Sequence, residues 1–156
     1  MKLLRADREG FHFDLSPREK RLLFDLLKFY PRVPAAHQRL SRTAQPQPND
    51  ENQRLLDDAV TAHREENKRQ ILAWLNEPER FKPTGAGHRF TLSAPQMEWL
   101  LQVLNDVRVG SWIALGSPDT EAGEKITLDE RTAPHFWVME MAGFFESALL
   151  EALEGE

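Results

Sequence analysis

Apolar positions near the start of the chain follow the period of two that is typical of strands. Residues 3–6 form a short, mostly apolar run, and Phe11, Phe13 and Leu15 alternate with polar side chains. Such alternation indicates a strand with one buried face. Gly10 lies between the two runs and suits a hairpin loop, because glycine adopts positive φ without steric cost. The pattern therefore predicts an N-terminal β-hairpin.

Four later segments carry apolar residues at helical spacing, three and four positions apart. We expect these helices at about residues 17–30, 51–76, 95–116 and 133–153. Prolines or glycines stand near the ends of the first three segments, and these residues terminate helices. We also expect a short helical piece at residues 35–40.

Two of the predicted helices begin with the same local signal. Ser16 is followed three residues later by Glu19, and Ser93 by Gln96. In such a capping box the serine side chain accepts a hydrogen bond from a free N–H of the first turn. The later side chain in turn accepts one from the serine backbone. The two capping boxes therefore predict helix starts directly after Ser16 and Ser93.

The residues before the two caps also match one another. Phe-x-Leu-Ser occurs at residues 13–16 and again at residues 90–93. This repetition predicts that residues 89–92 add a third strand to the hairpin. The fold class is therefore predicted as α+β, mainly α, with four main helices packed with a small antiparallel N-terminal β-hairpin or sheet.

Length and loop composition predict a single domain over residues 1–156. A chain of this length buries roughly two-thirds of its unfolded surface in one core. Proline, glycine and polar residues replace the apolar pattern at about residues 43–50, 77–88 and 117–125. We expect these three segments to be exposed loops.

The last predicted helix is apolar over more than one face. Phe136, Trp137, Met141, Phe144 and Phe145 do not fit on a single stripe. A helix of that breadth needs partners on two sides. It is therefore expected either to be the central helix of the bundle or to form part of a subunit interface.

Composition excludes several classes of function. The chain has no cysteine, which rules out disulfides, thiolate zinc sites, iron–sulfur clusters and a cysteine nucleophile. It also lacks the Gly-x-Ser-x-Gly, phosphate-loop and His-Glu-x-x-His signatures. We predict no catalytic residue, no metal site and no cofactor. No apolar run reaches the ~20 residues of a membrane span, and no signal peptide is recognisable, so we expect a soluble, cytoplasmic protein.

The net charge of −5 conceals two halves of opposite sign. Residues 1–48 hold ten basic and five acidic side chains, whereas residues 49–156 hold ten basic and twenty acidic ones. The halves either attract one another, within the fold or between two copies, or simply line solvated faces. The acidic balance disfavours nucleic-acid binding, for which the basic segment 18–42 is the candidate.

A polar group interrupts the third predicted helix. Asn105, Asp106 and Arg108 lie close to Gly110, and a glycine within a helix costs about 1 kcal/mol relative to alanine. We expect Gly110 to admit a neighbouring helix at Gly143.

Arg108 near the apolar face needs a carboxylate partner, for which Glu140 on the last helix is the candidate. One interpretation is a small anion or carboxylate site formed by Asn105, Asp106, Arg108 and Glu140. The other is a structural salt-bridge network between helices or subunits.

His63 and Glu66 are spaced so that both can face a metal ion on a helix. His63 and Asn67, one turn apart on the apolar stripe, instead suggest a buried hydrogen-bonded pair. We favour the pair, because no other predicted helix offers a matching set of ligands.

Asp129, Glu130 and His135 cluster before the last helix. A carboxylate and an imidazole can perform acid–base chemistry. Acidic residues at a helix start also stabilise the helix through its dipole, and Thr132 is a plausible cap. We favour this structural interpretation.

Leu104-Asn105-Asp106-Val107-Arg108 is the motif of a family resemblance. With the order of elements and the pattern of the last helix, it resembles an uncharacterised, actinobacterial-type family of a domain of unknown function, often encoded near a Clp protease adaptor. The resemblance covers nearly the whole chain and implies the order hairpin, capped helix, long charged helix, Leu-Asn-Asp-x-Arg helix and aromatic final helix. It carries no established activity, and its genomic company implies a role near regulated proteolysis.

The sequence thus favours a non-catalytic interaction or regulatory domain, self-associating as a homodimer, with a protein partner that it does not identify. One alternative is a small-molecule binding protein or small enzyme around Asn105, Asp106 and Arg108. The other is nucleic-acid binding through residues 18–42.

Overall fold

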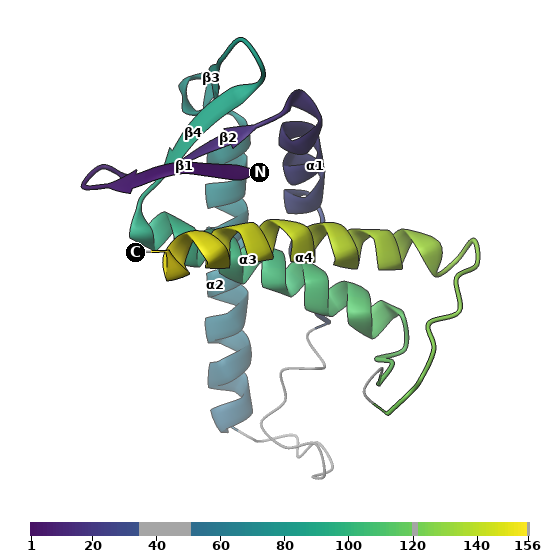
Figure 1. Ribbon diagram of the computed structural model, residues 1–156. Coiled ribbons are helices and arrows are strands. Elements are labelled where there is room, and N and C mark those ends of the chain that lie inside the picture. The colour runs from purple at the N-terminus through teal and green to yellow at the C-terminus, as the bar shows by residue number, and fades with distance from the viewer. Residues whose placement is uncertain (35–50, 120–121, 156) are drawn as a thin grey trace.

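A computed structural model describes residues 1–34, 51–119 and 122–155 of the chain. Over these residues it contains four α-helices and one four-stranded antiparallel sheet, so the predicted mainly helical α+β class is confirmed (Figure 1). The predicted helical piece at 35–40 and the predicted loop at 43–50 lie outside the described residues. The described part of 117–125 is a loop, as expected.

The sheet is assembled from two hairpins that are far apart in the sequence. β1 (Lys2–Asp7) and β2 (Gly10–Leu15) form the first, and β3 (Lys82–Pro83) and β4 (His88–Leu92) form the second. The strand order is β1-β2-β4-β3, with β2 antiparallel to β4. The predicted N-terminal hairpin and the predicted third strand are therefore confirmed.

The expectation of an exposed loop over residues 77–88 is wrong in its middle. A 3-10 turn, η2 (Pro78–Arg80), leads into Phe81, which is only 4% exposed and stacks on Phe90. Strand β3 follows and pairs with β4. A single apolar residue among prolines and glycines has no periodicity, so the sequence pattern could not reveal its burial.

Both predicted capping boxes are present. Ser16 begins α1 (Pro17–Leu27) and Ser93 begins α3 (Ala94–Ala114), each with the reciprocal side-chain bonds of a capping box. α1 ends at Leu27, three residues earlier than expected, and the chain then turns through a cis Tyr30–Pro31 bond. Thr132 makes no cap bond to α4 (Ala133–Glu154), contrary to expectation.

The helices cover one face of the sheet. α3 packs most extensively with α4, and Figure 1 shows the two running side by side in opposite directions below the sheet. α2 (Glu51–Leu75) packs its buried side chains into the core along only part of its length. Its buried residues, Asn67, Ile71 and Trp74, all lie in the second half, and the first half extends beyond the other helices (Figure 1).

The core lies between the sheet and the helices. Phe13 on β2 stacks on its cross-strand neighbour Phe90, and Trp74 of α2 meets Phe90 and Trp99 edge-on. Aromatic pairs of this geometry stabilise a core beyond the area that they bury. Among the described residues, none of the helices is both long and apolar enough to cross a lipid bilayer.

Candidate functional site

The structure divides the predicted group on α3 between two sides of that helix. Asp106 faces the segment after α1, where its Oδ1 accepts hydrogen bonds from the backbone N–H of Arg32 (2.5 Å) and of Val33 (3.2 Å). Arg108 faces α4 instead. Asn105 connects the two sides, because its Oδ1 accepts a 3.2 Å bond from Arg108.

Arg108 has a carboxylate partner on α4, but it is Glu146. Arg108 Nε lies 2.6 Å from Glu146 Oε2, and Glu146 is only 8% exposed. The expectation of Glu140 as the partner is wrong, and that residue is exposed. The two glutamates are six positions apart, so they point about 120° away from one another around the helix. Burial raises the pKa of Glu146, and the Arg108 charge opposes this shift.

The close neighbour of Gly110 is also different from the one expected. A Cβ on Gly110 would lie 2.5 Å from the backbone carbonyl carbon of Arg32. Gly143 is in ordinary contact distance of Arg108, at 3.7 Å from its Cδ. Gly110 therefore admits the chain segment after α1, and the predicted Gly110–Gly143 helix contact is wrong.

A cavity of about 410 Å³ that is widely open to solvent lies beside Asp106, between α2, α3 and the segment after α1. Three α3 positions at i, i+3 and i+4 face it, together with one side of α2 and one tyrosine. Its lining residues are Tyr30, Ala59, Val60, His63, Arg64, Asn67, Gln102, Asn105 and Asp106. Two of the predicted site residues, Asn105 and Asp106, belong to this cavity, whereas Arg108 and Glu140 do not.

Hydrogen bonds order the inner wall of the cavity. Asn67 Nδ2 donates to the Tyr30 hydroxyl at 2.9 Å and lies 3.2 Å from His63 Nε2. The predicted His63–Asn67 pair is thus confirmed as a hydrogen bond, but only Asn67 is buried. Glu66 pairs with Arg69. Burial raises the pKa of Tyr30.

The cavity holds charges of both signs. Arg64 donates to the backbone oxygen of Val33 at 2.7 Å, while Asp106 accepts from the N–H of the same residue. Sequence reasoning missed Tyr30, Arg64 and Gln102. The spacing of positions 60, 63, 64 and 67 and of positions 102, 105 and 106 shows that each set shares one helix face, but only the fold shows that the two faces meet.

The predicted acid–base group before α4 does not come together. Asp129 Oδ1 accepts bonds from the backbone N–H groups of Arg131 and Thr132 and from the Thr132 hydroxyl. Hydrogen bonds from Thr132 lower the pKa of Asp129. His135 Nδ1 instead lies 2.6 Å from Arg32 Nη2. Asp129 therefore orders the entry into α4, in agreement with the structural interpretation.

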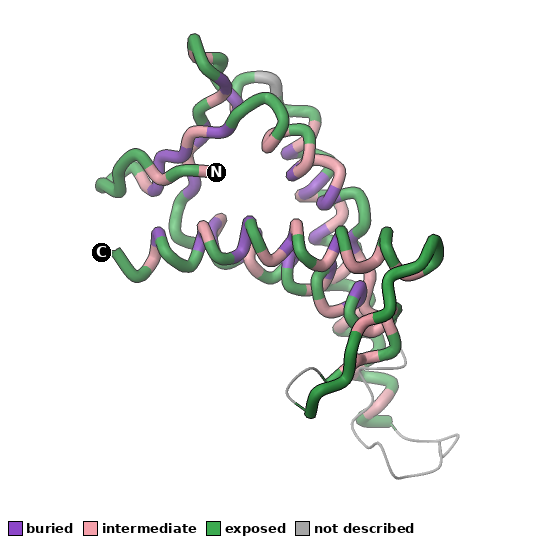
Figure 2. The backbone as a smooth tube through the Cα atoms, turned by 45° about the vertical axis from the view of Figure 1, so that its right-hand side comes forward, coloured by how far each residue is buried: buried purple, intermediate pink, exposed green. Residues whose placement is uncertain are grey.

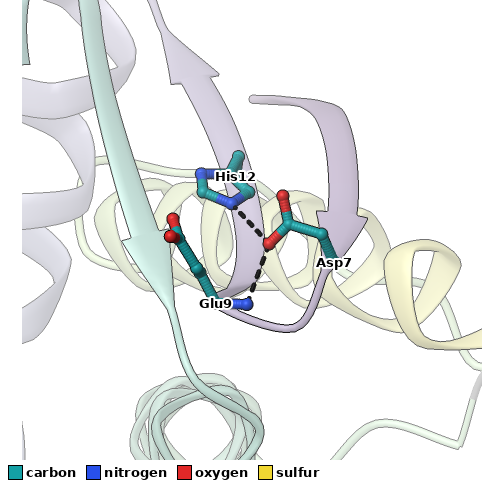
Figure 3. A group of neighbouring side chains, drawn as sticks. All are labelled: Asp7, Glu9 and His12. Carbon is teal, nitrogen blue, oxygen red and sulfur yellow. Dashed lines mark hydrogen bonds and ion pairs between the residues drawn. The ribbon is translucent and has the colours of Figure 1, made fainter.

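A further polar group lies at the turn of the first hairpin (Figure 3). Ligand atoms of Asp7, Glu9 and His12 come within 4.8 Å of one another, as a metal site would require. Asp7 Oδ1 accepts from Glu9 N and lies 3.0 Å from His12 Nε2, and Asp7 Oδ2 pairs with Arg5. His12 Nδ1 lies 2.9 Å from the Thr91 hydroxyl. These partners occupy both Asp7 oxygens and both His12 nitrogens, so we interpret the group as a brace between β1, β2 and β4.

Two aromatic side chains are exposed on the outer face of α4. Trp137 and Phe144 are 44% and 45% exposed, and Met141 and Ala148 lie half-buried on the same stripe, where Met141 also packs against the core. The buried residues of α4 point elsewhere, and Figure 2 shows buried and exposed positions alternating along this helix. The predicted breadth of the apolar surface of α4 is therefore present, and within the described residues one side of it is uncovered.

Three described basic residues of the segment 18–42 contact other side chains of the protein. Lys20 lies over the rings of Phe24 and Phe81, and Lys28 pairs with Asp25. The Arg32 side chain contacts His135. The arginines at positions 39 and 42 lie outside the described residues. Arg18 and Arg21 of the same segment are exposed.

Comparison with known proteins identifies one family that the chain matches. A sequence model described as Domain of unknown function (DUF2017) matches residues 1–153. No curated protein and no solved structure matches the chain.

Proposed function

The chain belongs to the family described as Domain of unknown function (DUF2017), and we propose that it acts as a non-catalytic interaction or regulatory domain that pairs with a second copy of itself. The pairing surface is the outer face of α4. We further propose that it forms a single domain and works in the cytoplasm. Its cysteine-free composition is compatible with that reducing compartment, where proteins rarely contain disulfides.

The observation that carries this proposal is the exposed aromatic stripe on α4. Trp137, Met141, Phe144 and Ala148 follow one another at spacings of four, three and four residues, so they share an arc of about 60°. Two large aromatic side chains that are nearly half exposed leave apolar surface in water. Tryptophan and other buried aromatic anchors dominate the energetics of protein interfaces.

The stripe complements itself around a two-fold axis. When two α4 helices pack antiparallel about a point between positions 142 and 143, Trp137 faces the partner's Ala148 and Met141 faces the partner's Phe144. A large side chain thus meets a small one at each end, and two side chains of intermediate length meet at the centre. Such isologous contacts are the commonest way in which identical chains associate.

Charges at the two ends of α4 support the same antiparallel arrangement. Arg131 is exposed just before the helix, and Glu151 and Glu154 are exposed in its last turn. The register described above places Arg131 beside the partner's Glu154. It also places Glu151 beside the N-terminal end of the partner's α4, where the helix dipole favours negative charge. A parallel arrangement would bring like charges together.

Sedimentation or light scattering between about 1 and 500 µM tests the proposal. A single helix pair is a small interface, so we expect a dimer with a Kd of about 10–100 µM. Phe144→Glu should make the protein monomeric throughout this range. Leu72→Glu, at an exposed apolar position of α2, is the matched control and should still dimerise.

A charge exchange tests the register. Arg131→Glu should weaken the dimer, and the double variant Arg131→Glu with Glu154→Arg should restore it. A protein that stays monomeric at all concentrations refutes the pairing, and so does a dimer that Phe144→Glu leaves intact.

A further inference from the structure

The cavity between α2, α3 and the Tyr30 segment presents two charges of opposite sign that form no ion pair within the described residues. Asp106 uses Oδ1 for two backbone N–H groups, and its Oδ2 has no hydrogen-bond partner in the described part of the chain. Arg64 uses one N–H for the backbone oxygen of Val33 and has no carboxylate partner within that same part. A guanidinium and a carboxylate that line a cavity without neutralising one another suit a ligand that carries both charges.

The backbone of Val33 sets an upper limit on the distance between the two charged groups. Asp106 accepts from its N–H at 3.2 Å and Arg64 donates to its oxygen at 2.7 Å. With the dimensions of one residue between these bonds, the two charged groups are at most about 9–10 Å apart. An α-amino acid with one hydrogen bond at each charged end spans about 9 Å.

Neutral groups complete the lining. The Tyr30 hydroxyl accepts from Asn67, which leaves its own proton free to donate. Asn105 uses its oxygen for Arg108, so its amide N–H groups stay available among the described residues, as does the Gln102 amide. Ala59 and Val60 add a short apolar wall. These groups fit a small polar molecule with a modest aliphatic part.

From this geometry we propose that the cavity binds a free α-amino acid with a short aliphatic side chain. Arg64 holds its carboxylate, and Oδ2 of Asp106 holds its ammonium group. A simple anion gains from Arg64 but is repelled by Asp106, and a simple cation meets the reverse situation. The inference is independent of dimer formation, because no residue of α4 lines the cavity.

Calorimetric titration of the full chain with L-leucine tests the proposal. Its two matched analogues are L-leucinamide, which lacks the carboxylate, and 4-methylpentanoate, which lacks the ammonium group. We expect L-leucine to bind at least tenfold more tightly than either analogue, because each charge-assisted hydrogen bond contributes on the order of tenfold or more. No heat of binding at roughly 10 mM L-leucine overturns the proposal, and so does an analogue that binds as tightly.

Three variants connect the binding to the cavity. Asn105→Trp places an indole in the cavity from an exposed helix position and should abolish binding, while Glu98→Trp, exposed on the same helix outside the cavity, should not. Asp106→Asn keeps an oxygen for the backbone N–H groups but removes the charge, so it should lose at least tenfold for L-leucine and none for 4-methylpentanoate. Binding that survives Asn105→Trp places the ligand elsewhere and overturns the assignment.

Discussion

The backbone of Arg32 lies so close to Gly110 that a Cβ on the glycine would come within 2.5 Å of the Arg32 carbonyl carbon. The main chain cannot swing aside as a flexible side chain would, and Asp106 holds it in place through two N–H groups. Gly110→Ala should therefore lower the free energy of unfolding by about 1–3 kcal/mol, the usual effect of overpacking. Urea denaturation measures this change.

Gly143→Ala is the matched control for that substitution. Its Cβ would meet only Arg108 Cδ at 3.7 Å, which is ordinary contact. Alanine is the better helix former by about 1 kcal/mol, so this variant should be as stable as the wild type or more stable. Equal destabilisation by the two alanines would mean that the approach of Arg32 does not explain Gly110.

The two capping boxes lead to a second prediction. The side chains of Ser16 and Ser93 each accept a hydrogen bond from the backbone N–H of the third helical residue. The backbone N–H of each serine donates in turn to the side-chain oxygen of that same residue. Replacing either serine with alanine should lower the free energy of unfolding by about 1 kcal/mol. Ser147→Ala, exposed within α4, is the control and should be neutral or slightly stabilising. Thermal unfolding of the three variants compares them, and a control that loses as much as the caps contradicts the prediction.

The features that sequence predicted well are those fixed by neighbours along the chain. The capping boxes at Ser16 and Ser93 and the alternation at Phe11, Phe13 and Leu15 depend on residues within a few positions. Because both strands that precede the caps have the same pattern, the sequence also predicted that they belong to one sheet.

The features that sequence missed depend on contacts between distant segments. Phe81 is buried because Phe24, Trp74 and Phe90 surround it, although its neighbours along the chain are polar or proline. The partner of Arg108 was assigned to the correct helix but to the wrong face, since only the packing of α3 on α4 decides which glutamate it meets. For the same reason, the sequence placed Asn105 and Asp106 in one group with Arg108 and Glu140, although only the first two line the cavity.

The ion pair between Arg108 and Glu146 gives a prediction about pH. Burial raises the pKa of Glu146 in the folded protein above its ordinary value of 4.5, and Arg108 limits that rise. A raised folded pKa means that Glu146 contributes stability below about pH 4.5, which is lost as pH rises through the folded value. Arg108→Met raises this pKa further. Its penalty should therefore be small at about pH 4, where Glu146 is protonated in both states.

By about pH 7 the penalty of Arg108→Met should reach about 1 kcal/mol, a modest value because the Arg108 side chain is 46% exposed and its charge is screened. Denaturant unfolding at several pH values measures it. Glu146→Gln cannot ionise, so it should gain stability relative to the wild type as pH rises, and in that background Arg108→Met should have the same effect at every pH. A penalty that is equal at pH 4 and pH 7 would show that Arg108 acts through the packing of its stem, because only a charge interaction with Glu146 follows the ionisation of that carboxyl group.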